Sequence, residues 1–296
     1  MNTRNLRFRS NKVKDILTLF HEELDPLYDS GEVGMFIDML FEAFLGWDKV
    51  RLLVGKEQTI DQSDLLRFHW ALEDLKRQRP IQHIIGHTDF CGCRIAVSPD
   101  VLIPRPETEE MVNSLTPGPS PWGEGSKMLD LCTGSGCIAI ALKKAFPQAE
   151  VTAVDISDSA LGIARQNAQN NGVDVSFVQA DVLSPDFNFR FSIFDLIISN
   201  PPYVRESERA GMQRNVLDYD PALALFVPDD DPLRFYRALG DMAQQCLAPD
   251  GLLVVEINEA LADETCDLLK GRGLCPTVHT DFRGRPRWIS AQPLNT

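Results

Sequence analysis

No apolar run in this 296-residue chain is long enough to cross a membrane. Its longest runs, such as residues 251–255, have the length of a strand, whereas a spanning helix needs about 20 consecutive apolar residues. The N-terminal segment is basic and lacks the apolar core of a secretory signal. We therefore expect a cytoplasmic protein that makes no membrane contact.

Cysteine and histidine are present but lack the spacing of a disulfide framework or a metal site. The seven cysteines form no CxxC pair and leave an odd number, so we expect reduced thiols in the core. The five histidines are scattered. His83 and His87 are four positions apart, but Gly86 between them argues against a metal-binding helix. We expect no metal.

An excess of positive charge is also missing. Lys and Arg number 29 against 43 Asp and Glu, which gives a net charge of −14. A protein that grips duplex DNA needs a basic surface to displace counterions from phosphates. The charge balance argues against stable nucleic-acid binding and favours a small molecule or a basic protein as partner.

Hydrophobic periodicity predicts an all-α first part. Apolar residues recur there at spacings of three and four, which is typical of amphipathic helices. We expect a helical bundle over residues 1–80, a connection with a β-hairpin over residues 81–103, and a second domain over residues 104–296. The expected helices lie at 13–27, 35–45 and 62–77, and the hairpin strands at 88–90 and 94–97.

From residue 127 onward, strand patterns alternate with helix patterns. This alternation predicts an α/β fold with a doubly wound, mainly parallel sheet. Ligands in such sheets bind outside the carboxyl ends of the strands. The expected strands lie at 128–131, 151–154, 175–178, 194–199, 252–257, 277–280 and 288–291, and the helices at 136–145, 157–170, 232–246 and 259–270.

A glycine-rich segment, DLCTGSGCIA at residues 130–139, follows the first of these strands and opens a helix. Glycines in this position allow a tight turn and a close approach of the backbone to a ligand. Asp155 ends the next strand, where a carboxylate can accept both hydroxyls of an adenosine ribose about 20 residues after the glycines. The pattern predicts a nucleotide-containing cofactor, and a glycine turn without a ligand is the alternative.

The loop alone does not decide which nucleotide it binds. Gly134, Gly136 and Ala139 also satisfy the GxGxxA dinucleotide pattern, so an NAD-dependent oxidoreductase remains an alternative. We expect Asp130 at the mouth of the loop, where its carboxylate would favour a cationic group over a pyrophosphate. No His or Lys is placed as a hydride-transfer acid. S-adenosylmethionine, with its sulfonium and ammonium charges, fits better.

The segment Asn-Pro-Pro-Tyr at residues 200–203 follows the strand expected at 194–199. Its two prolines fix two φ angles and remove two backbone donors. The resulting stiff corner presents one amide, bare carbonyls and an aromatic face. Such a corner suits a planar NH2 group, with two acceptors for its hydrogens and a ring over its flat face. A proline-rich loop without a ligand is the alternative.

With these motifs placed, the chain resembles the HemK family of glutamine-N5 methyltransferases, and specifically its peptide chain release factor subfamily. The resemblance covers nearly the whole chain. It rests on IPRPETE (103–109), DLCTGSGCIAIAL (130–142), Asp155, NPPY (200–203) and YDPALAL (219–225). Two features depart from the family: Cys132 stands where many members have glycine, and the Pro/Gly-rich residues 116–126 interrupt a helix that usually runs on. We expect that segment to be a surface loop.

The resemblance implies a class I S-adenosylmethionine-dependent methyltransferase with a Rossmann-like sheet, acting on the GGQ motif of class 1 release factors. We expect a monomer. The implied cofactor-binding residues are Cys132, Thr133, Gly134, Ser135, Gly136, Asp155, Val182 and Asn200. The implied substrate-binding residues are Asn200, Pro201, Pro202 and Tyr203. Arg105, Glu107 and Thr108 would edge the cofactor pocket, and Glu256 is either a site residue or a solvated strand end.

Three of these residues are expected to be catalytic: Asn200, Pro201 and Tyr203. The Oδ1 atom of Asn200 and the carbonyl of Pro201 would accept the two N–H bonds of the substrate amide, and Tyr203 would pack against the amide plane. This arrangement would hold the nitrogen in line with the sulfonium methyl and stabilise the developing positive charge. No general base is required before transfer.

Two further methyltransferase classes share part of this pattern. NPPY also occurs in adenine-N6 DNA methyltransferases, against which the acidic charge argues. Glutamine methyltransferases that act on a large-subunit ribosomal protein resemble the chain too, but they usually break the PRPET segment after Pro-Arg. Both remain alternatives to the release factor enzymes.

Overall fold

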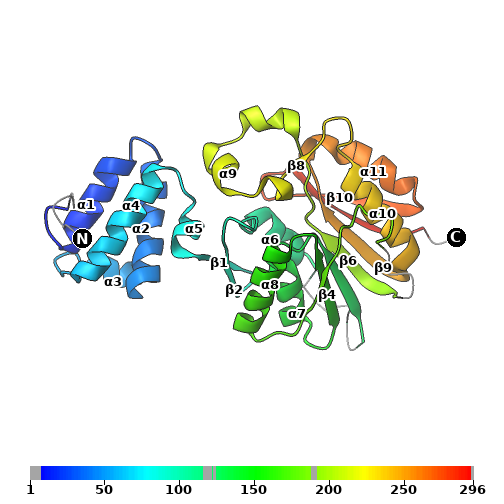
Figure 1. Ribbon diagram of the computed structural model, residues 1–296, viewed down its shortest axis with the longest axis horizontal. Coiled ribbons are helices and arrows are strands. Elements are labelled where there is room, and N and C mark those ends of the chain that lie inside the picture. Colours follow the sequence, from blue (N-terminus) through cyan, green and yellow to red (C-terminus); the bar gives the residue numbers. More distant parts are fainter. Residues whose placement is uncertain (1–7, 116–121, 123–124, 188–191, 295–296) are drawn as a thin grey trace. The chain divides into compact units, whose positions relative to one another are not determined.

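The computed structural model describes residues 8–115, 122, 125–187 and 192–294. The chain divides into two compact units, Met1–Gly86 and His87–Thr296 (Figure 1). Each unit has a hydrophobic core of its own. Within the described ranges, none of the helices combines the length and apolarity needed to cross a bilayer.

The first unit is all-α, as predicted. Its helices are α1 (Val13–Leu24), α2 (Ser30–Leu45), α3 (Lys49–Val54), α4 (Gln62–Lys76) and α5 (Ile81–Ile85). Phe68 lies at the centre of the core, with ring centroids 4.5 Å from Phe41 and 6.3 Å from Phe20. Helices α3 and α5 were not predicted, because five or six residues are too few to show a helical period.

The second unit is built on a seven-stranded sheet with the order β10–β11–β9–β6–β3–β4–β5. Strand β11 runs antiparallel to both of its neighbours, and the other four pairs are parallel. The mainly parallel sheet is therefore confirmed. The strands are β3 (Lys127–Leu131), β4 (Glu150–Asp155), β5 (Ser176–Gln179), β6 (Phe194–Ser199), β9 (Leu247–Glu256), β10 (Leu274–Thr280) and β11 (Pro286–Pro293).

Helices cover both faces of this sheet (Figure 1). Consecutive residues of a strand point to opposite faces, and accordingly Leu196 joins the core that contains α7 and α8, whereas Ile197 joins the core that contains α10 and α11. The covering helices are α7 (Cys137–Ala145), α8 (Asp158–Asn171), α10 (Arg234–Cys246) and α11 (Ala262–Lys270). Both faces are buried, which explains the continuous apolar runs in the sequence.

Strands β3 and β6 lie side by side at the centre of the sheet. From β3 the chain moves outward through β4 to β5, and then returns to β6 on the other side of β3. The strand order therefore reverses between β3 and β6, and the crevice at their carboxyl ends is the expected ligand position. The glycine-rich segment follows β3, and Asn200 follows β6.

Smaller elements complete the second unit. A hairpin of β1 (His87–Phe90) and β2 (Cys93–Ala96) precedes α6 (Pro106–Asn113). Between β6 and α10 the chain makes an excursion, and a last short turn precedes α11. These segments contain β7 (Val204–Arg205), η2 (Glu206–Gly211), α9 (Arg214–Tyr219), η3 (Ala222–Ala224), β8 (Phe226–Val227) and η4 (Glu259–Leu261).

The loop predicted at residues 116–126 lies largely outside the described residues. Trp122 is described, and its ring packs edge-on against Phe146, with centroids 5.6 Å apart. Elsewhere, the element boundaries differ from the prediction by a few residues, most at the starts of α2 and β9, which begin at Ser30 and Leu247 instead of at residues 35 and 252.

Candidate active site

A cavity of about 480 Å³ opens at the carboxyl ends of β3, β4 and β6, within the second unit. Eight of the predicted site residues line it: Cys132, Thr133, Gly134, Ser135, Asp155, Val182, Asn200 and Pro202. Gly136, Pro201 and Tyr203 are not among its lining residues. The structure thus brings the glycine loop and the Asn200 corner to one cavity.

The loop after β3 turns through left-handed backbone conformations. Cys132, Gly134 and Gly136 have φ values of 61°, 54° and 80°. Gly134 leaves open space toward the cavity, since a Cβ there would meet nothing within 4 Å. Gly136 has a different role, because its Cβ would lie 3.0 Å from the Cβ of Ala164 and would disturb the packing of α7 on α8.

Asp155 supports this loop from the end of β4. Its Oδ2 accepts a hydrogen bond from the Gly134 N–H at 2.8 Å, and its Oδ1 accepts one from the Ser157 N–H at 2.9 Å. Each carboxylate oxygen keeps a second lone pair. The side chain therefore fixes the loop and can still accept the hydroxyls of a ligand in the cavity.

Asp130 is not at the mouth of the loop, and that expectation was wrong. It belongs to β3 and is completely buried. Its Oδ2 accepts the Thr133 hydroxyl and, at 3.2 Å, the Ala139 N–H, so it braces the loop from within. Burial raises the pKa of Asp130 to about 7, although these two donors oppose the rise. The error arose because strand alternation places this carboxyl under helix α7.

The corner after β6 is tied directly to the end of β3. The Ser199 hydroxyl donates to the Leu131 carbonyl at 2.6 Å, and Pro201 and Pro202 are both buried. Asn200 follows Ser199 and lines the cavity. The corner is therefore held rigidly against the strand that carries the glycine loop.

A chain of side-chain hydrogen bonds runs from Asn200 into the interior. The Asn200 Nδ2 donates to the Thr108 Oγ1 at 3.0 Å, and the Thr108 hydroxyl donates to the Glu256 Oε2 at 2.6 Å. The Tyr203 hydroxyl donates to the other carboxylate oxygen of Glu256 at 2.9 Å. The ring of Tyr203 is thereby fixed, and its predicted packing against a substrate amide stays a prediction.

Glu256 is 1% exposed. The alternative of a solvated strand end is therefore wrong. Burial raises the pKa of Glu256, and the hydroxyls of Thr108 and Tyr203 and the charge of Arg287 act in the opposite direction. Burial, together with this neighbouring carboxyl, raises the pKa of Tyr203 well above its usual value. Tyr203 is therefore a hydroxyl donor at any ordinary pH.

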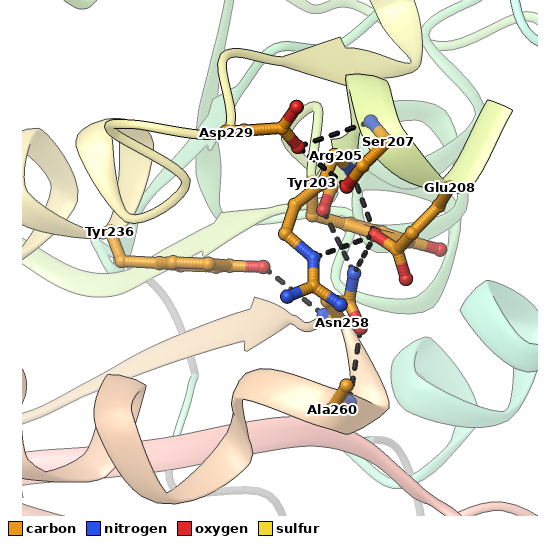
Figure 2. A network of polar contacts seen from close by, with 8 residues as sticks. All are labelled: Tyr203, Arg205, Ser207, Glu208, Asp229, Tyr236, Asn258 and Ala260. Atoms are coloured by element: carbon orange, nitrogen blue, oxygen red, sulfur yellow. Dashed lines mark hydrogen bonds and ion pairs between the residues drawn. The ribbon is translucent and has the colours of Figure 1, made fainter.

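A second polar network anchors the backbone that leaves the corner (Figure 2). The Asn258 Nδ2 donates to the Tyr203 carbonyl at 3.1 Å and to the Glu208 Oε2 at 2.9 Å. The same Glu208 oxygen accepts the Arg205 N–H at 2.8 Å, and the Asn258 N–H donates to the Tyr236 hydroxyl at 3.3 Å. The segment after the corner is thus held to the residues that follow β9.

Helix α6, which carries the PRPETE segment, connects four separate parts of the unit. The Arg105 guanidinium pairs with the buried carboxyl of Asp220 at 2.6 Å. Three further contacts come from the helix itself: Thr108 to Glu256, Glu109 to the Cys91 N–H and Glu110 to the Phe282 N–H. Of the predicted pocket-edge residues, Thr108 lines the cavity, whereas Arg105 and Glu107 are absent from its lining.

Asn167 is a site-supporting residue that the sequence did not suggest. It is fully buried on α8. Its Nδ2 donates to the Ser135 carbonyl of the glycine loop and to the Ala96 carbonyl, and its Oδ1 accepts the Ala96 N–H. The polar side chain thus joins the loop to the β-hairpin. An asparagine on the apolar face of an amphipathic helix was the available hint.

The charges around the cavity are mostly negative. Asp100, Asp155 and Asp181 line it, and Arg234 is the one cation among its described lining residues. In the parts of the chain that the structure describes, no group of three or more His, Cys, Asp or Glu side chains could hold a metal ion.

Proteins of known family are similar to this chain over most of its length. Over 281 residues the chain is 41% identical to the release factor glutamine methyltransferase of Flavobacterium psychrophilum, and the alignment covers 94% of this chain and 98% of that protein. The chain belongs to the release factor glutamine methyltransferase family. Another family member, from Bacteroides thetaiotaomicron, is 40% identical over 86% of this chain and 90% of its own length.

Both units contribute to the family match. Residues 110–218 match the model of the methyltransferase small domain, and residues 32–86 match that of the PrmC N-terminal domain. Among solved structures, the catalytic domain of hMettl16 in complex with MAT2A 3'UTR hairpin 6 has a TM-score of 0.53 at 15% identity, covering 82% of this chain and 86% of that chain. This likeness shows the fold alone.

Proposed function

We propose that this chain transfers the methyl group of S-adenosylmethionine to the side-chain amide nitrogen (N5) of a glutamine in a class 1 release factor, at its GGQ motif. The observation that carries the proposal is that the glycine loop with Asp155 and the amide of Asn200 line one cavity. A site for a nucleoside-bearing donor and a site for an NH2 group are thereby adjacent, in a chain whose relatives are release factor glutamine methyltransferases.

The cavity fits S-adenosylmethionine better than a dinucleotide. Its three lining aspartates attract a sulfonium and an ammonium group, whereas they repel a pyrophosphate. Asp155 has free lone pairs for the ribose hydroxyls, and the open space beside Gly134 admits the methionine part. When bound, S-adenosylmethionine supplies a methyl group on a positively charged sulfur.

The residues of the corner would promote methyl transfer by holding the substrate amide nitrogen in the orientation that the reaction requires. An amide nitrogen is a weak nucleophile because its lone pair is delocalised into the carbonyl. Acceptors at Asn200 Oδ1 and at the Pro201 carbonyl would hold both N–H bonds and stabilise the positive charge that develops as the N–C bond forms. The bond from the methyl carbon to sulfur would break at the same time, with its electron pair left on a neutral thioether. The proton then leaves the methylated nitrogen to water, which regenerates a neutral amide.

Replacing Asn200 by alanine tests this function. We expect Asn200→Ala to lower kcat at least ~100-fold, the scale seen on removing one preorganised polar group. Turnover is measured with S-adenosylmethionine carrying a labelled methyl group, a class 1 release factor and mass spectrometry of the modified peptide. Asn170→Ala, on an exposed part of α8, serves as the matched control. Near-normal turnover of Asn200→Ala would refute the assigned role.

The same assay separates the alternatives. Label on a glutamine of the release factor supports the proposal, whereas label on a ribosomal protein or on adenine in DNA supports one of the other two methyltransferase classes. A ligand that binds the folded state raises the melting temperature. A rise with NAD and none with S-adenosylmethionine would indicate an oxidoreductase instead.

A further inference from the structure

Asn200 is linked to Glu256 through Thr108, and the chemistry of the three side chains fixes which atom donates in each of the two hydrogen bonds. Burial disfavours the charged form of Glu256, but the hydroxyls of Thr108 and Tyr203 on its two oxygens and the nearby charge of Arg287 favour it, and we take the group as a carboxylate, which can only accept. A threonine hydroxyl has one proton, and that of Thr108 is directed at Glu256 over 2.6 Å, a length typical of a bond to a charged oxygen. The Thr108 oxygen is therefore left as an acceptor.

This direction fixes which end of the Asn200 amide faces Thr108. An acceptor at Thr108 Oγ1 requires a donor at 3.0 Å, so the NH2 group of Asn200 must point to it. Asn200 Oδ1 has no partner among the described residues and belongs to a side chain that lines the cavity. If the Thr108 proton were free instead, the Asn200 amide could rotate by half a turn, accept that proton at Oδ1 and offer its NH2 group to the ligand. Two NH2 groups facing each other cannot form a hydrogen bond.

We propose that Glu256 is a positioning residue that, through Thr108, makes Asn200 present its amide oxygen rather than its NH2 group to the substrate amide. The inference rests on the proposed function and goes beyond it, because Glu256 lies under the cavity wall and does not line the cavity. Through its second oxygen the same side chain also holds Tyr203, so that one buried carboxyl group orients both polar side chains of the corner.

The decisive variant is Glu256→Gln, which keeps the shape of the side chain and gives it an NH2 group. That group can donate to Thr108, which releases the Thr108 proton toward Asn200 and permits the reversed amide. We expect kcat on the release factor to fall about 10- to 100-fold, the scale of losing a group that orients a reacting residue. The Kd for S-adenosylmethionine, measured by calorimetry, should remain that of the unmodified protein.

Two threonine variants test the same path without changing the charge. Thr108→Val removes the hydroxyl and should lower kcat, and Thr108→Ser restores a hydroxyl and should recover most of the loss. If Glu256→Gln does not fold, these two variants still test whether the Thr108 hydroxyl orients the Asn200 amide. Glu110→Gln is the matched control, since Glu110 lies on α6 and contacts the Phe282 N–H rather than the chain of hydroxyls.

A spectroscopic readout keeps this inference separate from the proposed function. The side-chain NH2 resonances of Asn200, assigned by their loss in Asn200→Asp, should shift in Glu256→Gln and in Thr108→Val and stay in place in Glu110→Gln. If the unmodified protein methylates no release factor, the proposed function fails, while the shifts still decide the orientation of the amide. Unchanged Asn200 resonances, unchanged kcat, or a loss of cofactor affinity that parallels the loss of kcat would overturn the role of Glu256.

Discussion

The two sides of the cavity are held in place by different means. The glycine loop is supported over shorter separations in the sequence: Thr133 bonds to Asp130, three residues away, Gly134 to Asp155, 21 residues away, and Ser135 to Asn167, 32 residues away. The Asn200 corner is supported from a distance: Asn200 bonds to a residue 92 positions away, and Tyr203 to one 53 positions away. The loop is a largely local structure, whereas the corner acquires its chemistry from the folded unit.

This difference predicts two kinds of failure. Changes at the glycine loop should weaken cofactor binding and leave the corner intact. Changes along the path from Asn200 to Glu256 should lower turnover and leave cofactor binding intact. The experiments on Asn200 and Glu256 described above examine the corner, and the three that follow examine the loop, beginning with the largest expected effect.

Asp155→Ala should have the largest effect on the loop side. It removes a carboxylate that fixes Gly134 and that we expect to hold the ribose hydroxyls. Losing two hydrogen bonds to a charged group costs on the order of 3 kcal/mol, or about 100-fold in the Kd for S-adenosylmethionine. At saturating cofactor, kcat should be retained. Calorimetry and steady-state kinetics measure both quantities.

Asp158→Ala is the matched control for this experiment, because Asp158 begins α8 only three residues later and has an exposed side chain. A variant of Asp155 that binds the cofactor normally would contradict the assigned role. A loss of kcat equal to the loss of affinity would remove the distinction between the two sides of the cavity.

Asp130→Asn should change how stability depends on pH. The folded protein raises the pKa of Asp130 from 3.8 to about 7, so it binds this proton more tightly than the unfolded chain does. The stabilisation is therefore fully present below pH 3.8 and is lost progressively as the pH rises from there to about 7. Asparagine does not titrate. Between pH 5 and pH 8 the variant should gain about 3 kcal/mol relative to the unmodified protein.

Urea unfolding at several pH values measures this change. The expected result is a flatter pH profile for Asp130→Asn than for the unmodified chain. Parallel profiles would show that the carboxyl is ionised under the loop, and that the loop is braced by a charge.

Substitution of Cys132 should have the smallest effect on stability, and two variants that both lack the thiol control for its loss. Its φ of 61° is left-handed, which costs a residue with a Cβ about 1 kcal/mol and costs glycine almost nothing. Cys132→Gly and Cys132→Ala both remove the thiol, and they differ in this strain. We expect the glycine variant to be more stable than the alanine variant by up to about 1 kcal/mol in urea unfolding. Equal stability of the two would show that the loop relaxes around the residue.

The sequence was sufficient to predict the main parts of the fold. Apolar residues at spacings of three and four located the helical bundle, and short apolar runs between helices located the strands of the sheet. Burial determines where apolar residues stand in the sequence, so these elements can be recognised from it. The glycine loop and Asp155 were predicted for a related reason, since a tight turn after a strand demands particular residues at neighbouring positions.

The supporting structure of the corner could not be predicted from periodicity. Thr108 and Glu256 are 148 positions apart, and nothing in the sequence near either residue indicates the other. The PRPETE segment illustrates the same limit. Its pattern was recognisable, but its contacts with Asp220, Cys91 and Glu256 depend on the folded unit. The position of Asp130 was mistaken because a polar residue at a strand end suggested exposure, whereas the side chain points under a helix.

Helix α6 has eight residues and would not persist in isolation. Its side chains, with Arg105 just before it, reach the β-hairpin, the excursion before α10, the end of β9 and the turn between β10 and β11. The helix therefore has no folding equilibrium of its own, and it can detach only if contacts to four regions break together. Loss of one contact leaves the other three in place, whereas mutations that break several of them together should unfold the whole unit and not only open the wall of the cavity.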